Sequence, residues 1–182
     1  MAERLIDLLR RINRGVAYLV GVLLFACAGF VLADIVLRQM GSSFGGTDEI
    51  SGYVMAIATS WGMAYTMLEL GHVRIDLVRR RPGPRGRALF DLGALVVTSG
   101  VIVLIAVKCW PVLARSIKNG STANTPLETP LVLVQWPWFL GWVWFAVMAC
   151  LLSLAALSLI LKGQFDRSEQ AIGAFGEQDS AI

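Results

Sequence analysis

The stretch DEISGYVMAIATSWGMAYTMLELGHVRID, residues 48–76, decides the fold of this chain. After two acids it runs from Ile50 to Leu70 without a full charge before Glu69. At about 1.5 Å per residue this run makes a helix of roughly 31 Å, close to the thickness of a bilayer's hydrocarbon core. We therefore predict a membrane-spanning helix over residues 50–70.

The composition extends this prediction to the whole chain. Of its 182 residues, 56% are hydrophobic and 16% are charged, and the mean hydropathy is +0.65. Soluble domains carry about 25% charged residues, so this chain has too little charge to cover a water-exposed surface. The basic pI does not indicate nucleic-acid binding, because the cations cluster beside apolar runs. We predict an all-α integral membrane protein surrounded by membrane lipids.

Three further apolar runs are long enough to cross a bilayer. The four predicted spans lie at about residues 16–37, 50–70, 88–107 and 138–161. They form one transmembrane domain over residues 1–162, followed by a polar, loosely ordered tail over 163–182. The last apolar run begins at Leu131 and is too long for one upright crossing. Pro137 is the natural break in that run, which makes residues 131–135 an interfacial or re-entrant piece.

The N-terminal residues 2–14 alternate leucines and arginines at helical spacing. This pattern predicts either an amphipathic helix on the inner leaflet or a helical extension of the first span. The first span also has the basic start of a signal peptide. Its apolar run continues to Leu37, however, so we expect an uncleaved span.

The distribution of basic residues predicts the orientation. With both termini inside, four Lys and Arg residues of the N-terminus, six between residues 71 and 87, and two in the tail lie on the cytoplasmic side. Four lie outside. Because cytoplasmic loops are enriched in Lys and Arg, we predict that both termini are cytoplasmic. Near the outer end of the first span, Asp34 and Arg38 are four residues apart and are predicted to pair locally, with a partner contact as the alternative.

Small residues mark one face of the second span. Gly52, Ala56, Ser60 and Ala64 repeat every four residues, and Trp61 lies beside them. Such a stripe lets a neighbouring helix approach closely in a membrane. We predict that this face packs against another helix.

The sequence gives no indication of an enzyme, a cofactor site or a metal site. His72 is the one histidine, so bis-histidine haem ligation is excluded, and the three cysteines have no C-x-x-C spacing. No predicted span carries a full charge near its midpoint, where a transporter usually places its ion or substrate ligands. We therefore expect an accessory subunit that supports a larger partner.

Several residues together resemble one known family. They occur after the first span, in the second span and its inner loop, and at the start of the last span: Arg38, Glu49, Gly62-Met63-Ala64, His72-Val73-Arg74-Ile75-Asp76, Thr125-Pro126-Leu127, Pro130, Pro137 and Gly141. In this pattern the chain resembles the small membrane subunit, the DctQ type, of tripartite ATP-independent periplasmic (TRAP) transporters. One departure is visible, because the family tends to place an aromatic residue where Ala58 stands here.

The resemblance implies a bacterial inner-membrane complex. In that family a large multi-span permease subunit binds substrate and sodium and moves like an elevator. A periplasmic substrate-binding protein delivers an organic acid, such as a C4-dicarboxylate, a keto acid or a sialic acid. The small subunit would be a non-catalytic, static scaffold.

The resemblance and the helix faces together assign roles to particular residues. We expect the large subunit to contact Gly52, Ala56, Ser60, Trp61 and Ala64. We expect the inner end of the second span to be anchored by Gly62, His72, Arg74 and Asp76. We expect the binding protein to dock on Arg38, Asp48, Glu49 and Glu128.

Two other classes of protein stay open. The chain could be the membrane anchor of another complex, since nothing in its spans excludes that role. It could also be a small stand-alone four-helix transporter. That class needs a substrate-binding acid within a span, and the nearest candidate, Glu69, lies close to the cytoplasmic end.

Overall fold

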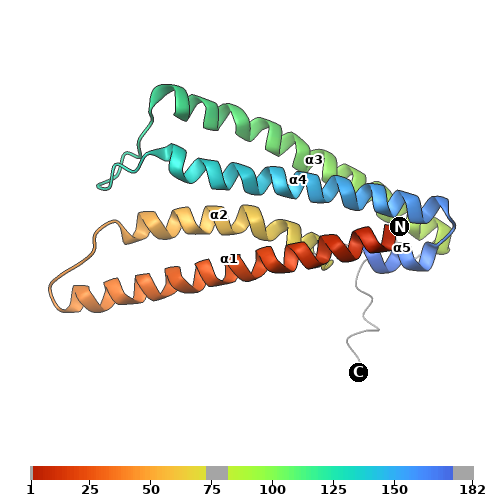
Figure 1. Ribbon diagram of the computed structural model, residues 1–182, viewed down its shortest axis with the longest axis horizontal. Helices are drawn as coiled ribbons and strands as arrows, with labels where there is room; N and C mark the ends of the chain where they lie inside the picture. The colour runs from red at the N-terminus through yellow and green to blue at the C-terminus, as the bar shows by residue number, and fades with distance from the viewer. Residues whose placement is uncertain (1, 73–81, 174–182) are drawn as a thin grey trace.

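The computed structural model describes residues 2–72 and 82–173. Over these residues the chain is all-α, as predicted, with α1 Ala2–Gln39, α2 Thr47–Leu68, α3 Pro84–Asn119, α4 Leu131–Leu161 and α5 Phe165–Ile172. The first four helices run side by side along the long axis of the molecule (Figure 1). Helix α4 packs on both α3 and α2, and α2 also packs on α1.

The two ends of the bundle differ. One end carries the α1–α2 connection at residues 40–46 and the α3–α4 connection at residues 120–130, and we call it the two-loop end. The other end carries the start of α1 and the short helix α5, and we call it the terminal end (Figure 1). The start of α1 and α5 thus lie on one side, which agrees with the predicted even number of crossings.

The core of the bundle follows α4. Its buried side chains include Phe145, Leu152 and Leu159, which pack with Leu68 of α2 and Leu95 of α3. Alanines interleave with these large side chains along α4. In lipid, helices associate through close van der Waals packing, and small residues permit that approach. Helix α4 is therefore the central helix on which α2 and α3 assemble.

Three of the described helices, α1, α3 and α4, are long and apolar enough to cross a membrane. Helix α2 does not reach the same mean hydropathy, because glycine, serine, threonine and tyrosine occupy much of its 22 residues. Helix α2 nevertheless lies between α1 and α4 in the bundle. Three of the four predicted spans thus fall in candidate membrane-spanning helices, and the fourth crossing and the cytoplasmic termini stay predictions.

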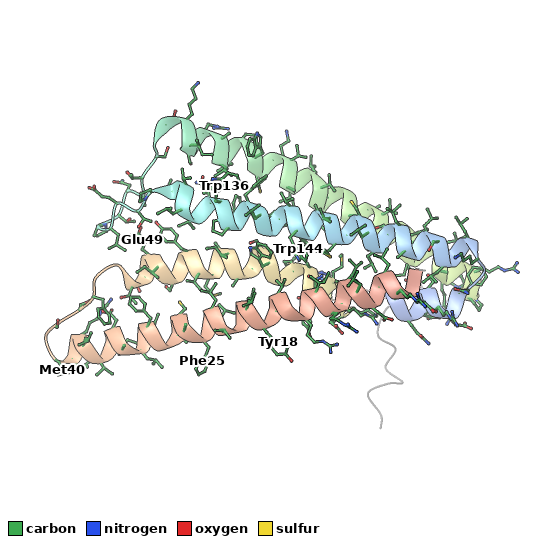
Figure 2. All side chains as sticks on the ribbon, viewed as in Figure 1. Tyr18, Phe25, Met40, Glu49, Trp136 and Trp144 are labelled. Atoms are coloured by element: carbon green, nitrogen blue, oxygen red, sulfur yellow. The ribbon has the colours of Figure 1, made fainter. Side chains whose placement is uncertain are left out.

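The apolar belt of the bundle is exposed on α1. Tyr18, Val22, Phe25 and Leu32 are each more than half exposed, and Phe25 is 85% exposed. Figure 2 shows Tyr18 and Phe25 pointing away from the other helices. In a bilayer this surface faces lipid or another subunit.

The helices differ from the sequence predictions in three places: at Pro137, at the end of α3 and in the tail. The predicted break at Pro137 is wrong, because α4 runs unbroken from Leu131. Helix α3 likewise continues through Pro111 to Asn119, well past the predicted span end at Val107. Prolines are tolerated in such helices because neighbouring groups satisfy the freed backbone atoms. Residues 2–14 belong to α1, so of the two predicted alternatives the structure has the helical extension of the first span and not a separate helix on the membrane surface.

The third difference is the tail. Residues 165–172 were expected to be loosely ordered and instead form α5, with Ala171 and Ile172 buried. The helix is amphipathic, so its apolar side packs on α3 and α4 although its overall composition is polar. Arg167 forms a salt bridge with Glu3, which ties α5 to the start of α1.

Candidate subunit-contact sites

The small-residue stripe of α2 is used in two different ways. At its inner half, Ser60 and Ala64 are buried. A Cβ atom added to Gly141 of α4 would lie 2.2 Å from Ser60 Oγ and 2.9 Å from Trp61 Cδ1. The absence of a side chain at Gly141 is thus what allows α2 and α4 to touch. The close helix contact that the stripe predicted is present within this chain.

The outer half of the stripe is open. Gly52 and Ala56 are exposed, and nothing lies within 4 Å of a Cβ atom built on Gly52. Neither residue has a side chain larger than a methyl group. A helix from another subunit can therefore approach α2 here, on the same face that α4 uses further along.

Tryptophans connect three helices through hydrogen bonds. Trp61 Nε1 donates to the carbonyl oxygen of Pro137 at 2.9 Å, and its ring stacks on Trp144 with 6.1 Å between centroids. Trp144 Nε1 in turn donates to Asn13 Oδ1 at 3.0 Å. Asn13 Nδ2 donates to the carbonyl oxygen of Leu9, also at 3.0 Å. The result is a polar link from α2 through α4 to α1.

Sequence analysis missed Asn13 as a functional position. Asn13 is fully buried, and it continues the buried face that Ile6 and Leu9 begin. The spacing of three and four residues was the available signal, since an amide on an apolar helix face requires a buried hydrogen-bond partner.

A second set of polar contacts fixes the two-loop end. Asp34 is 1% exposed and accepts hydrogen bonds from Arg38 Nε at 2.7 Å, Ser43 Oγ at 2.9 Å and the backbone N–H of Phe44 at 2.8 Å. The predicted Asp34–Arg38 pair is therefore present. The same carboxylate also binds the α1–α2 connection, so its charge serves the local fold.

Glu49 ties the start of α2 to the α3–α4 connection. The nearby Thr125 hydroxyl is the largest cause of the lowered pKa of Glu49, and the hydrogen bond that the Tyr53 hydroxyl donates to Glu49 Oε1 adds to it. Figure 2 places Glu49 beside that connection. A Cβ atom built on Gly46, whose φ is +67°, would lie 2.3 Å from Leu127 Cδ1. Polar and apolar contacts thus join the two loops.

The four predicted docking residues are therefore not equivalent. Arg38 is half exposed but paired with Asp34, and Glu49 is engaged as described. Asp48 and Glu128 are exposed. Asp48 also lines a depression of about 570 Å³ between the start of α2 and the α3–α4 connection. Of the four, Asp48 and Glu128 are the more accessible to a partner.

The predicted inner anchor is only partly described. His72 lies four residues beyond the last residue of α2, with its ring 6.5 Å from the ring of Phe145 in the middle of α4. Gly62 lines a shallow groove between α1 and α2. Arg74 and Asp76 lie outside the described residues. Among the residues that are described, no group of three His, Cys, Asp or Glu side chains could hold a metal ion.

Together, the apolar helices and the internal use of their polar groups define a multi-pass α-helical membrane protein. Comparison with protein families identifies it further. The chain belongs to the DctQ component family of tripartite ATP-independent periplasmic transporters, whose family model matches residues 27–163. The match confirms the resemblance and identifies the chain as a component of a transporter. Searches of curated proteins and of solved structures gave no match.

Proposed function

We propose that this chain is the small, non-catalytic permease subunit of its transporter and acts as a fixed scaffold for the large membrane subunit. It crosses the inner membrane four times, with both termini in the cytoplasm. The observation that carries the proposal is the internal use of buried polar groups. The hydroxyls of Ser99 and Ser153 hydrogen bond at 2.9 Å, and Trp144 binds Asn13. These groups hold helices together, so they are not presented to a solute.

In this proposal the large subunit binds and moves the solute. A soluble binding protein delivers an organic acid of the C4-dicarboxylate, keto acid or sialic acid type, and a sodium gradient drives uptake. Family membership supports the tripartite organisation. The solute class and the coupling ion are what the resemblance to this family implies.

The large subunit contacts α2 at Gly52 and Ala56, the exposed part of the stripe. Ser60, Trp61 and Ala64 contribute indirectly, because they fix α2 against α4. Beyond the end of α2, His72 with Arg74 and Asp76 anchors the second span, and Gly62 keeps the groove between α1 and α2 open. At the two-loop end, Asp48 and Glu128 face the binding protein, while Arg38 and Glu49 hold the loops that present them.

Co-purification tests the interface. Replacing Gly52 and Ala56 together by leucine should reduce the amount of this chain recovered with a tagged large subunit, because the added side chains prevent close approach. Gly100→Leu is the matched control, since Gly100 is an exposed helical glycine on α3 with nothing within 4 Å of its Cβ position. Equal recovery of the double variant and the control would contradict the assignment.

Reconstitution tests the function itself. The chain in liposomes without the large subunit should transport no organic acid, and uptake should require both membrane subunits and the binding protein. Transport by the chain alone would identify a stand-alone carrier instead. Stable co-purification with a soluble complex, in the absence of any large membrane subunit, would identify a membrane anchor.

A further inference from the structure

One exposed stripe of α3 changes its chemistry along its length. The stripe repeats at alternating steps of four and three residues and consists of Val97, Val101, Leu104, Lys108, Pro111, Arg115 and Lys118, all exposed. Its first three positions are aliphatic, three of the last four are basic, and the remaining one is Pro111. Because these positions share one helix face, they point in one direction, and a change of residue type along them reflects a change of surroundings with depth in the membrane.

The change at Lys108 marks where α3 leaves the hydrocarbon layer. From Leu89 to Val107 no exposed side chain of α3 is charged, whereas beyond that band the exposed apolar side chains Trp110, Val112 and Ile117 are interspersed with exposed cations. At about 1.5 Å per residue that band is roughly 27 Å long, close to the roughly 30 Å of a hydrocarbon core. A lysine directly after the band can place its ammonium group among the lipid headgroups.

Aromatic side chains give an independent marker at the same level. Trp110 lies 5.6 Å from Phe139, and Phe139 lies 6.4 Å from Trp136, measured between ring centroids. Both tryptophans are exposed over about half or slightly less of their surface. Tryptophans concentrate at the membrane–water interface. Two different features therefore locate the membrane surface next to Lys108.

Helix α3 does not stop at that surface. It continues to Asn119, so Arg115 lies about 10 Å and Lys118 about 15 Å beyond Lys108 along the helix. The headgroup layer adds only roughly 5–7 Å per leaflet to the hydrocarbon core. Arg115 and Lys118 consequently extend past the lipid headgroups into water, and we call residues 108–119 the α3 arm.

The α3 arm is held in place by the rest of the fold. Its inner face, formed by Cys109, Leu113 and Ser116, is buried. The helix ends in a left-handed Gly120 whose N–H donates to the Ser116 carbonyl oxygen. Ser121 accepts a hydrogen bond from the backbone N–H of Leu131 at 2.9 Å, which closes the connection to α4. The arm is thus a preformed element.

The outer face of the arm carries uncompensated positive charge. The segment from Lys108 to Asn119 contains no acid. In the part of the chain that the structure describes, no acidic side chain forms a salt bridge with Lys108, Arg115 or Lys118. In the proposed orientation, cations at this end also act against the positive-inside preference. They require a complementary acid from elsewhere.

We propose that the α3 arm is a docking surface for an acidic patch on the soluble substrate-binding protein of the transporter. The inference rests on the proposed function, which supplies a soluble partner on this side of the membrane. Exposed charges that face water act mainly on the rate of encounter and on choice of partner. The arm therefore captures and orients the binding protein before tighter contacts form.

Charge reversal tests this role in the assembled complex. The chain and its large subunit are placed in nanodiscs of zwitterionic phosphatidylcholine, and association of the purified binding protein is followed by biolayer interferometry. At low salt, Arg115→Glu with Lys118→Glu should lower the association rate about tenfold and reduce its dependence on ionic strength. Arg115→Lys with Lys118→Arg should keep the wild-type rate. Lys162→Glu, an exposed reversal at the terminal end, is the control.

Three results would overturn the proposal. They are an unchanged association rate in the double reversal, an equal loss in the Lys162→Glu control, and an effect that appears only when anionic lipid replaces phosphatidylcholine. The last result would assign the arm to lipid headgroups. Recovery of the membrane complex is measured first for each variant. Failure of the chain to assemble with the large subunit would refute the proposed function, whereas normal assembly with unchanged binding would refute only the docking role.

The position of the arm is tested separately by spin labelling. Single cysteines at positions 104 and 118 are introduced into a chain whose three native cysteines are replaced by alanine. A nitroxide at position 118 should be accessible to a water-soluble nickel reagent, and one at position 104 to oxygen dissolved in lipid. Lipid-like accessibility at position 118 would remove the basis for a water-exposed arm.

Discussion

Gly141 offers the sharpest test of how the bundle is held together. An alanine there would place its Cβ 2.2 Å from Ser60 Oγ, 2.8 Å from Ser60 Cβ and 2.9 Å from Trp61 Cδ1. The Oγ contact can be relieved by rotating the Ser60 side chain. The Cβ contact cannot, because Ser60 Cβ moves only with the backbone of α2. Gly141→Ala must therefore displace α2 from α4.

The expected loss follows from two opposing effects. Overpacking a tight contact costs about 1–3 kcal/mol of the free energy of unfolding. Replacing glycine by alanine in a helix contributes about 0.8–1.0 kcal/mol in the other direction. Over most of this range the clash is the larger effect, so Gly141→Ala should destabilise the chain by up to about 2 kcal/mol. Displacement of α2 should also weaken the Trp61–Pro137 hydrogen bond.

A double-mutant cycle identifies the clash as the cause. Ser60→Gly removes both nearer atoms, so it should recover most of the stability that Gly141→Ala loses, with a coupling energy of about 0.5–3 kcal/mol. Unfolding of the purified chain in mixed detergent micelles measures each variant. Gly100→Ala is the control, because it gains helix propensity and meets no atom within 4 Å. A Gly141→Ala chain as stable as the control, or no rescue by Ser60→Gly, would refute the packing argument.

Three further predictions concern the polar contacts. Asp34→Ala should cost about 1–3 kcal/mol in unfolding experiments, because the Phe44 N–H loses its acceptor, whereas Asp34→Asn should cost less. Trp144→Phe should cost a similar amount by leaving Asn13 Oδ1 without its donor, and Asn13→Leu combined with Trp144→Phe should recover part of it. The pKa of Glu49 is lowered below its usual 4.5, so the contribution of its contacts to stability is complete above that pH and is lost as pH falls through the lowered pKa. Protease cleavage of residues 120–130 should therefore increase at acid pH in the wild type, while Glu49→Gln should be cleaved readily at neutral pH and show little pH dependence.

The apolar helices were predictable because lipid imposes a simple rule. Each crossing must satisfy its backbone polar groups within the segment, so a long apolar run becomes a helix. The Asp34–Arg38 pair was predictable for a similar reason, since a spacing of four residues brings two side chains together on one helix face. These inferences need no knowledge of which helices touch.

The partner of the α2 stripe was not predictable from the sequence. The small side chains of Ser60 and Ala64 indicate that another helix packs closely here. They do not indicate whether that helix belongs to the same chain. The structure identifies Gly141 as the contact for this half, while Gly52 and Ala56 remain exposed. Only the three-dimensional arrangement divides the stripe into an internal part and an available part.

Helix ends were misjudged where one local signal was given too much weight. Pro137 removes one backbone donor, but the rest of α4 keeps its hydrogen bonds and Trp61 binds the Pro137 carbonyl oxygen. Residues 165–172 look polar on average, yet their apolar side chains share one face and bury Ile172. In both cases contacts with distant segments outweigh the local preference.

The contacts around Asn13 bear on why this subunit would stay still while its partner moves. Asn13, Trp144 and Trp61 link α1, α4 and α2 through directional hydrogen bonds and ring stacking. Breaking such a link leaves buried donors and acceptors unpaired, which opposes the sliding of one helix past another. At the two-loop end, Glu49 and Leu127 join the connections in the same way. A bundle held together at both levels resists internal rearrangement, which is the property that the proposed scaffold role requires.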